Sequence, residues 1–164
     1  SVQTAQELLA LLDKNIKSVA VTVSPTEEQL EQIHTLGFDY VQIHGKISEK
    51  LLSESKTPVI RAINVSGIES IGDIENLDNV KGILFDSAVP GSGQGFDWTL
   101  LKKLPKTDKM LFLAGGLTAD NVAAAICQVH PYAVDVSSGV GLADKSGKDF
   151  ELVRTFIENA RNSK

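Results

Sequence analysis

An apolar run that ends in a single carboxylate and then breaks into a glycine-rich loop is the feature of this sequence that most constrains its fold. Ile83, Leu84 and Phe85 lead directly into Asp86, and the loop at residues 90–98 reads Pro-Gly-Ser-Gly-Gln-Gly-Phe-Asp-Trp. A parallel barrel strand delivers an acidic side chain to its carboxyl end in this way. The pattern therefore predicts a buried strand with an active-site acid at its end.

The same construction recurs twice in the second half of the chain. Residues 111–117 and 133–140 each form a short apolar run that stops at small or glycine residues before a helical pattern. Three strand-to-loop endings of this kind predict repeated βα units. The leading interpretation is a TIM-barrel-like α/β architecture.

Hydrophobic spacing along the whole chain predicts six strands, each followed by a helix, after one leading helix at Val2–Leu12. The expected strands lie at residues 19–23, 40–45 and 58–65 and around Ile83, Leu111 and Val134. The expected helices lie at residues 25–36, 48–55, 68–77 and 97–104, from Thr118 or Asp120 to Val129, and at 148–161 with Phe150, Val153, Phe156 and Ile157 on one face.

Chain length fits one domain, but 164 residues are fewer than the roughly 200 to 250 of a complete eight-stranded barrel. We therefore expect residues 1–164 to form a single, incomplete TIM (βα)8 barrel domain, with six of the eight strands present.

Composition narrows the class of partner. The chain has 16 basic and 21 acidic residues, a net charge of −5 and no basic block. This balance disfavours nucleic acid and membrane surfaces as partners. No apolar run approaches the ~20 residues that cross a bilayer, and no signal-peptide pattern is visible, so we expect a cytoplasmic protein.

Cysteine chemistry is limited to one residue. Cys127 is the single cysteine, which excludes an intrachain disulfide and a cysteine-based zinc cluster. It lies in a helical pattern, where we expect a small buried thiol rather than a nucleophile.

Asp86 is the candidate catalytic residue. At the rim of a barrel its carboxyl group is placed to act as a general acid. An aspartate that caps its own loop would show the same local pattern, and the residues alone leave both interpretations open.

Two small-residue pairs are candidates for binding phosphate. Gly115 with Gly116, and Ser138 with Gly139, follow successive strands and precede helix starts whose backbone N–H groups can hold an anion. Plain turn chemistry is the alternative. Two such pairs at adjacent strand ends favour a phosphate cradle.

Two further side chains are candidates for contacting the substrate. Asp135 lies inside an expected strand, where a substrate hydrogen bond and a structural pair are equally plausible. His44 ends another strand and either binds substrate as a neutral imidazole or is a partly exposed loop histidine.

The remaining histidines, His34 and His130, fit structural roles in or near helices. The sequence contains neither histidines at metal-ligand spacing nor a P-loop or dinucleotide fingerprint. We therefore expect no bound metal and no cofactor.

Segments in a fixed order over essentially the whole chain carry a resemblance. They are Gln42–Gly45, Leu84–Ser87, Gly91–Trp98, Leu113–Val122 and Val134–Val140, closing with Gly147-Lys148-Asp149. Each alone is weak, but together they resemble phosphoribosylanthranilate isomerase of tryptophan biosynthesis.

The resemblance implies a (βα)8 barrel that converts N-(5′-phosphoribosyl)anthranilate to its 1-deoxyribulose isomer by a cofactor-free Amadori rearrangement. Asp86 matches the general acid, and Asp135 matches a residue near the anthranilate end of the site. The phosphate loops match Gly115, Gly116, Ser138 and Gly139. The implied partner is a small phosphosugar, and the implied assembly is a monomer or homodimer.

Several departures from the family pattern affect the expected chemistry. The family's general base is a cysteine in an N-terminal Lys-Ile-Cys-Gly strand, and an Arg after the second strand holds the anthranilate carboxylate; these 164 residues contain neither segment. We therefore expect the chain to lack the first two strands, and to be part of a longer polypeptide or to be complemented by another chain. Gly141 replaces a frequent glutamate, and Lys46 replaces an acidic residue.

Two rival functions remain open. The first is a non-catalytic barrel fragment that binds phosphate ligands. The second is another phosphosugar isomerase, epimerase or lyase. The absence of metal-ligand histidines disfavours a metal-dependent epimerase, and the absence of a lysine at a strand end disfavours a Schiff-base lyase.

Overall fold

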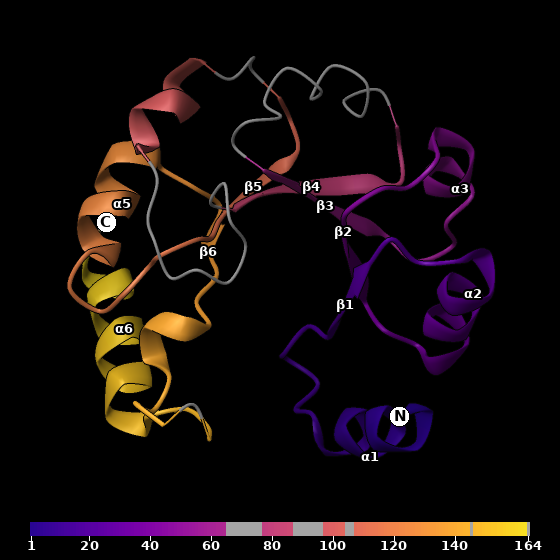
Figure 1. Cartoon of the computed structure of the whole chain (residues 1–164), viewed down its shortest axis with the longest axis horizontal. Helices are drawn as coiled ribbons and strands as arrows, with labels where there is room; N and C mark the ends of the chain where they lie inside the picture. Colours follow the sequence, from indigo (N-terminus) through magenta and orange to yellow (C-terminus); the bar gives the residue numbers. More distant parts are fainter. Residues whose placement is uncertain (65–76, 87–96, 104–106, 145, 164) are drawn as a thin grey trace. The chain divides into compact units, whose positions relative to one another are not determined.

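The computed structural model describes residues 1–64, 77–86, 97–103, 107–144 and 146–163 (Figure 1). The helices and strands alternate along most of this sequence. In chain order they are α1 (Val2–Leu11), β1 (Val19–Val23), α2 (Glu27–Leu36), β2 (Tyr40–His44), α3 (Glu49–Ser53), β3 (Val59–Asn64), β4 (Val80–Asp86), the 3-10 helix η2 (Trp98–Lys103), β5 (Met110–Leu113), α5 (Val122–Val129), β6 (Ala133–Val134), the 3-10 helix η3 (Ser138–Val140) and α6 (Phe150–Asn162).

The six strands formed by the described residues pair in the order in which they occur in the sequence, from β1 to β6. The pairing is parallel between β1 and β2, between β2 and β3, and between β5 and β6. The connections within these three pairs contain the helices α2, α3 and α5, respectively, as parallel pairing requires. The predicted α/β architecture with a parallel sheet is confirmed.

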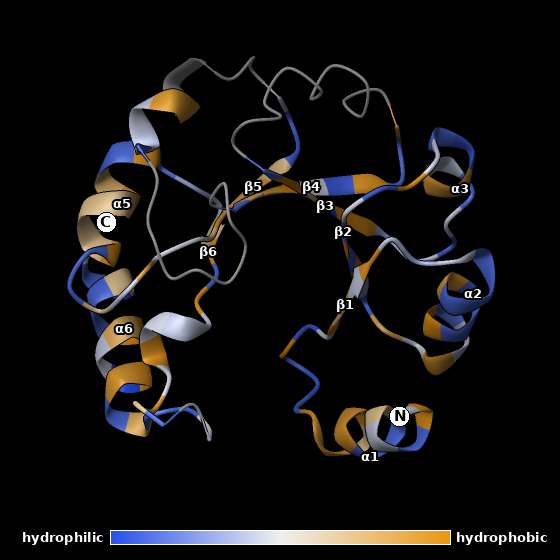
Figure 2. Ribbon diagram, in the orientation of Figure 1, coloured by the Kyte–Doolittle hydropathy of each residue, from blue (hydrophilic) through white to orange (hydrophobic). Residues whose placement is uncertain are grey.

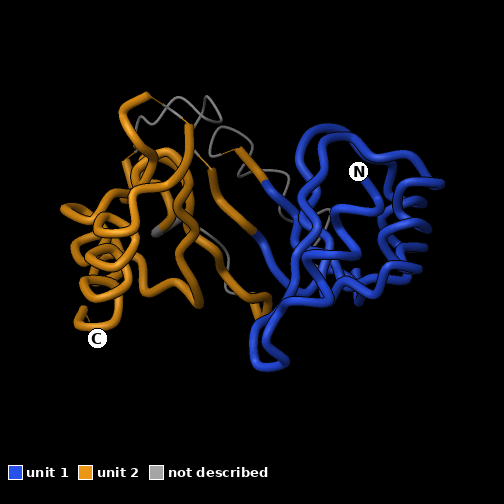
Figure 3. Tube along the Cα trace, turned by 90° about the horizontal axis from the view of Figure 1, so that it is seen from below, with its two compact units in different colours: residues 1–62, 72–83 blue, residues 63–71, 84–164 orange. Residues whose placement is uncertain are grey.

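The chain divides into two compact units (Figure 3). Unit 1 comprises residues 1–62 and 72–83, and unit 2 comprises residues 63–71 and 84–164. His44 belongs to unit 1, whereas Asp86, Asp135 and the four predicted phosphate-binding residues belong to unit 2.

Unit 1 is built on β2, whose central residues are buried. Val41 and Ile43 are fully buried, and Leu30 and Ile33 of α2 and Leu52 of α3 are nearly so. The apolar residues of these elements are visible in Figure 2 as orange segments. Burial of apolar area of this kind is the main source of stability for the unit.

Local signals set the boundaries of α2. The Thr26 side chain accepts a hydrogen bond from the Gln29 backbone, and the Gln29 side chain accepts one from the Thr26 backbone. This reciprocal capping box satisfies two N–H groups at the start of the helix. At the other end Gly37 adopts φ 82°, the left-handed conformation that commonly ends a helix.

Unit 2 contains β5, β6, η2, η3, α5 and α6. Phe156 of α6 is buried, as are Val122 and Ala125 of α5, and the two helices lie side by side (Figure 1). The Asn159 amide of α6 donates a 2.8 Å hydrogen bond to the Ala119 carbonyl just before α5. The Asp149 carboxylate caps α6 by accepting from the backbone N–H groups of Glu151 and Leu152.

The prediction of a buried strand at residues 19–23 is wrong for one face of β1. Val19, Val21 and Val23 are 38%, 64% and 74% exposed. These three side chains leave one face of the strand, and within the described residues β1 stands at the end of the strand order, paired with β2. Helix α1 is amphipathic as expected, but none of its residues is buried.

Three details in the C-terminal part also differ from expectation. Cys127 is exposed, not buried, because α5 turns Val122 and Ala125 inward instead. Phe150 is 85% exposed, so the packed face of α6 does not include it. Helix α5 begins at Val122, two residues after Asp120, the later of its two predicted starts, and its N-cap Asn121 makes no side-chain capping bond.

The strand observed at Val134 is shorter than the apolar run from which it was predicted. Strand β6 contains only Ala133 and Val134, because the paired strand β5 ends at Leu113. Asp135 therefore follows the strand instead of lying inside it. The predicted helix at residues 68–77 falls almost wholly outside the described residues.

Candidate active site

Asp86 is the last residue of β4, as the sequence predicts, and it is partly buried. The backbone next to it is fixed to the neighbouring strand end, since the N–H of Ala114 donates a 2.8 Å hydrogen bond to the carbonyl of Phe85. Asp86 is thereby held at the edge where β5 also ends. The glycine loop at residues 90–96 lies outside the described residues.

The turn after β5 requires its two glycines. Gly115 has φ 79° and Gly116 has φ 67°, backbone angles that residues with a side chain rarely adopt. Asn121 fastens this turn, because its amide nitrogen donates to the Gly116 carbonyl at 2.9 Å and its amide oxygen accepts from the Thr118 N–H at 2.8 Å. The sequence shows the glycine pair but not the role of Asn121, which depends on the folded turn.

The second small-residue pair lies against this turn. A Cβ added to Gly139 would be 1.9 Å from the Leu117 carbonyl oxygen and 3.2 Å from the Thr118 Cα. Only glycine allows the backbones of the two loops to approach so closely. The structure thus brings Gly139 against Leu117 and Thr118, the residues that directly follow Gly115–Gly116.

Asp135 lies at the same edge of unit 2. Its backbone N–H donates a 2.8 Å hydrogen bond to the Leu113 carbonyl, immediately before the Gly115 turn, and its side chain is exposed. Ser137 lies two residues after Asp135. The ammonium group of Lys148 donates to the Ser137 carbonyl at 2.7 Å and to the Ser137 hydroxyl at 3.1 Å. This lysine, part of the Gly147-Lys148-Asp149 segment, ties the loop before α6 to the start of η3.

His44 ends β2 in unit 1, as predicted, and is partly buried. The amide nitrogen of Gln42 lies 2.8 Å from the Nε2 of His44. An amide nitrogen donates and does not accept, so in this arrangement Gln42 donates to the Nε2 of His44. Gln42 is itself buried, which restricts the freedom of the pair.

Arg61 of β3 is a residue near His44 that the sequence analysis missed. Its guanidinium donates to the backbone carbonyls of Ile43, Gly45 and Ala62. Burial lowers the pKa of this guanidinium. A single charged residue within the apolar run at residues 58–63 was the signal that could have identified it.

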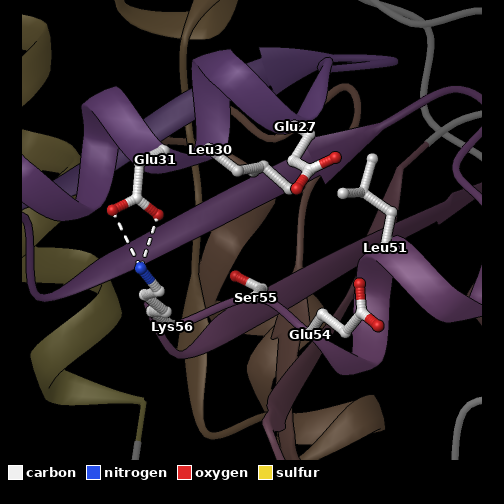
Figure 4. A pocket seen from close by; sticks show the side chains of 7 residues that line it. All are labelled: Glu27, Leu30, Glu31, Leu51, Glu54, Ser55 and Lys56. Atoms are coloured by element: carbon white, nitrogen blue, oxygen red, sulfur yellow. Dashed lines mark hydrogen bonds and ion pairs between the residues drawn. The ribbon is translucent and has the colours of Figure 1, made fainter.

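A pocket of about 220 Å³ is found elsewhere in unit 1, between α2 and α3 (Figure 4). Three of its side chains are acidic: Glu27, Glu31 and Glu54. Lys56 pairs with both oxygens of Glu31, at 2.9 and 2.8 Å, and lowers the pKa of that carboxyl group. None of the predicted site residues lines this pocket.

Over the described ranges, no three His, Cys, Asp or Glu side chains are grouped so as to hold a metal ion. Within the same part of the chain, no helix is long and apolar enough to cross a membrane.

Comparison with known proteins agrees with the resemblance seen in the sequence. The family model described as N-(5′phosphoribosyl)anthranilate (PRA) isomerase matches residues 1–159. The chain is 40% identical over 163 residues to N-(5′-phosphoribosyl)anthranilate isomerase of Streptococcus mutans, a match that covers 98% of this chain and 80% of that protein.

Solved structures show the same relationship. Monomers generated from the dimeric phosphoribosylanthranilate isomerase of Thermotoga maritima match with a TM-score of 0.78 and 30% identity, over 99% of this chain and 80% of that one. A phosphoribosylanthranilate isomerase in complex with reduced 1-(o-carboxyphenylamino)-1-deoxyribulose 5-phosphate matches with a TM-score of 0.78 and 31% identity, over the same two shares of 99% and 80%.

The matches extend over nearly all of this chain and over about 80% of each relative's own length. The identity, the length of the matched region and the agreement in fold all point to one family. This chain belongs to the N-(5′-phosphoribosyl)anthranilate isomerase family.

Proposed function

We propose that this protein isomerises N-(5′-phosphoribosyl)anthranilate to 1-(2-carboxyphenylamino)-1-deoxyribulose 5-phosphate, the reaction for which its family is named. The observation that carries the proposal is the arrangement within unit 2. There the Phe85 carbonyl, next to Asp86, accepts from the N–H of Ala114 at the start of the Gly115–Gly116 turn, and Gly139 lies against Leu117 just after that turn. An acid and an anion cradle at neighbouring strand ends suit a phosphorylated sugar.

Asp86 is the proposed general acid. It donates a proton to the ribose ring oxygen while the C1–O bond breaks, and the nitrogen lone pair forms a C1=N Schiff base. Loss of the C2 proton then gives an enol-amine, which becomes the C2 ketone when C1 gains a proton and the C2 hydroxyl loses its own. The substrate and the product are isomers, so no oxidant or cofactor enters the balance.

The base that removes the C2 proton is not assigned to a residue of this chain. The family resemblance gives that role to the cysteine of a Lys-Ile-Cys-Gly segment, which is not found in these 164 residues. The exposed Cys127 of α5 lies in a different sequence context and is not proposed for this step.

Gly115, Gly116, Ser138 and Gly139 are the proposed phosphate-binding residues. Backbone N–H groups in consecutive turns form concave sites for anions, and glycine leaves room for the phosphate to approach the backbone. The close contact of Gly139 with Leu117 supports this role because it joins the two loops into one surface.

His44 and Asp135 are proposed to contact the rest of the substrate. The imidazole of His44 lies at the end of β2, with its Nε2 2.8 Å from the Gln42 amide nitrogen. Asp135 has an exposed side chain at the end of β6, a position from which it can meet the anthranilate part of the substrate.

Several broader features belong to the same proposal. We infer a single (βα)8 barrel domain, a phosphosugar as the small-molecule partner, and a monomer or homodimer, the last supported by the dimeric relative from Thermotoga maritima. The cytoplasm is the proposed location, since biosynthetic phosphosugars are charged and are retained there.

Product identification tests the activity. The whole protein is incubated with N-(5′-phosphoribosyl)anthranilate, and ¹³C NMR follows the carbon signals. The proposal predicts loss of the anomeric C1 signal and appearance of a C1 methylene and a C2 carbonyl. An unchanged substrate spectrum at high protein concentration contradicts it.

A non-catalytic phosphate-ligand-binding protein is the second candidate. It is favoured by the combination of the Gly116–Gly139 cradle with the absence of an assigned base. Inorganic phosphate and a phosphate ester that bind with similar affinity, without any isomerisation, are the results that would favour it.

A further inference from the structure

Arg61 holds the backbone on both sides of His44. Its guanidinium donates to the Ile43 carbonyl at 2.6 Å and to the Gly45 carbonyl at 2.5 Å, and also to the Ala62 carbonyl at 3.0 Å. Ile43 and Gly45 are the residues immediately before and after His44. All of these groups lie in unit 1.

His44, which lies between Ile43 and Gly45, has its backbone held by Ser24, the residue after β1. The Ser24 N–H donates a 2.9 Å hydrogen bond to the His44 carbonyl, and the Ser24 hydroxyl accepts from the Lys46 N–H at 2.9 Å. Three consecutive carbonyls, those of Ile43, His44 and Gly45, therefore each have a partner from a neighbouring strand or strand end. Buried backbone groups require such partners, and here they also fix the direction of the chain.

Arg61 reaches these carbonyls from the opposite side of the sheet to the imidazole. Ile43 and Arg61 are register partners in the parallel β2–β3 pair, so their side chains leave the same face. Gln42 and His44 alternate with Ile43 and leave the other face. Arg61 consequently influences the imidazole through the backbone and not by direct contact.

The guanidinium of Arg61 bonds to backbone carbonyls. No ion pair of Arg61 is found in the part of the chain that the structure describes, and its hydrogen bonds there to Ile43, Gly45 and Ala62 all go to backbone oxygens. A planar guanidinium can bond two carbonyls at once along fixed directions, whereas a lysine ammonium presents a single charged point.

We propose that Arg61 is a positioning residue: it clamps the carbonyls of Ile43 and Gly45 and so fixes the His44 imidazole against Gln42 in the orientation used for substrate. The consequence for turnover rests on the proposed isomerase function. The consequence for the imidazole does not.

The test uses the whole protein with Arg61→Met and Arg61→Lys, and with Arg154→Met as the matched control. Arg154 is an exposed arginine of α6 that pairs with Glu151. Two quantities are measured: the imidazole ¹⁵N resonances, and kcat and KM for N-(5′-phosphoribosyl)anthranilate. The protein has three histidines, so His44→Gln identifies the His44 signals against those of His34 and His130.

The expected result is a change at His44 alone. Arg61→Met should mix the two ring tautomers of His44 and lower kcat/KM by about tenfold to a hundredfold, the range for a misplaced site group. Arg61→Lys should fall between Arg61→Met and the wild type. Arg154→Met should leave the His44 signals and the kinetics unchanged.

Other outcomes overturn the proposal. It fails if folded Arg61→Met has wild-type His44 resonances, or if these resonances change and kcat/KM does not. If Arg61→Met does not fold, the same comparison is made with Arg61→Lys. A wild-type protein without isomerase activity defeats the proposed function instead, and the imidazole signals still decide whether Arg61 clamps His44.

Discussion

Gly139 lies so close to Leu117 that a Cβ on Gly139 would be 1.9 Å from the Leu117 carbonyl oxygen. The loop after β6 is thereby fitted onto the turn after β5, in which Gly115 and Gly116 both have positive φ. A short contact between two backbones leaves no flexible side chain that can move aside. The relationship makes the proposed phosphate cradle a property of two loops acting together.

Gly139→Ala should therefore separate the loops. Forced displacement of backbone in a packed region typically costs 1–3 kcal/mol, and we expect a loss of about 2 kcal/mol in the free energy of unfolding. Because the N–H groups move, inorganic phosphate should bind about tenfold to a hundredfold more weakly, the loss of one hydrogen bond to a charged group. Urea denaturation and phosphate titration by calorimetry measure the two effects.

Gly147→Ala is the control for this substitution. The nearest heavy atom to a Cβ at Gly147 is the Leu142 Cδ1 at 3.8 Å, an ordinary contact. Stability and phosphate affinity should stay close to wild type. If Gly139→Ala behaves in the same way, the two loops are not locked together as described.

Gly45→Ala should destabilise unit 1 more than Gly37→Ala. Both glycines have positive φ, 68° and 82°, but only at Gly45 would the added Cβ meet other atoms, at 2.5 Å from the Ser24 hydroxyl. The left-handed backbone alone should cost about 1 kcal/mol at either position. The collision at Gly45 should add about 1–3 kcal/mol.

A double variant tests the source of the difference. The Ser24 hydroxyl is held by the Lys46 N–H, so it cannot rotate away without losing that bond. Ser24→Ala combined with Gly45→Ala should be more stable than the sum of the two single effects predicts. Strict additivity in urea denaturation would show that the contact with Ser24 does not cause the loss.

Asp39 should make the stability of unit 1 depend on pH in the acid range. Its carboxylate accepts from the Lys17 ammonium at 2.7 Å and from the backbone N–H and hydroxyl of Ser18, each at 2.9 Å. These hydrogen bonds, the one from Lys17 first, lower the pKa of Asp39 from 3.8 to about 2. The group ties the entry of β1 to the entry of β2.

The sign follows from the lower pKa in the folded state. The ionised carboxylate stabilises the fold fully above pH 3.8, and this contribution disappears as the pH falls to about 2. Asp39→Asn should therefore lose less stability than wild type across this window, and Lys17→Met should show an intermediate loss. Urea midpoints at several pH values would contradict the account if wild type and Asp39→Asn declined in parallel.

The parts of the fold that the sequence predicts well are determined by residues close together along the chain. Helix α2 was expected because Pro25, Thr26 and Gly37 mark its two ends locally, and the structure confirms it. The strand that ends in Asp86 was likewise identified from its own apolar run.

The parts that the sequence did not predict depend on distant partners. Arg61 bonds to the carbonyls of Ile43 and Gly45, residues that only the β2–β3 register brings close. Strand β6 stops at Val134 because β5 stops at Leu113, and Cys127 is exposed because packing turned another face of α5 inward. Apolar spacing identifies a strand or helix but does not state how far its partner extends.

The role of Asp86 as general acid is best tested by measuring turnover of Asp86→Asn, with Asp78→Asn as the control. Asp78 is exposed and precedes the same strand, so its substitution should leave kcat unchanged. The account predicts that Asp86→Asn lowers kcat by about 10²–10⁴, as for loss of a general acid, while phosphate-ligand affinity stays near wild type. Undiminished turnover of N-(5′-phosphoribosyl)anthranilate by Asp86→Asn would contradict it.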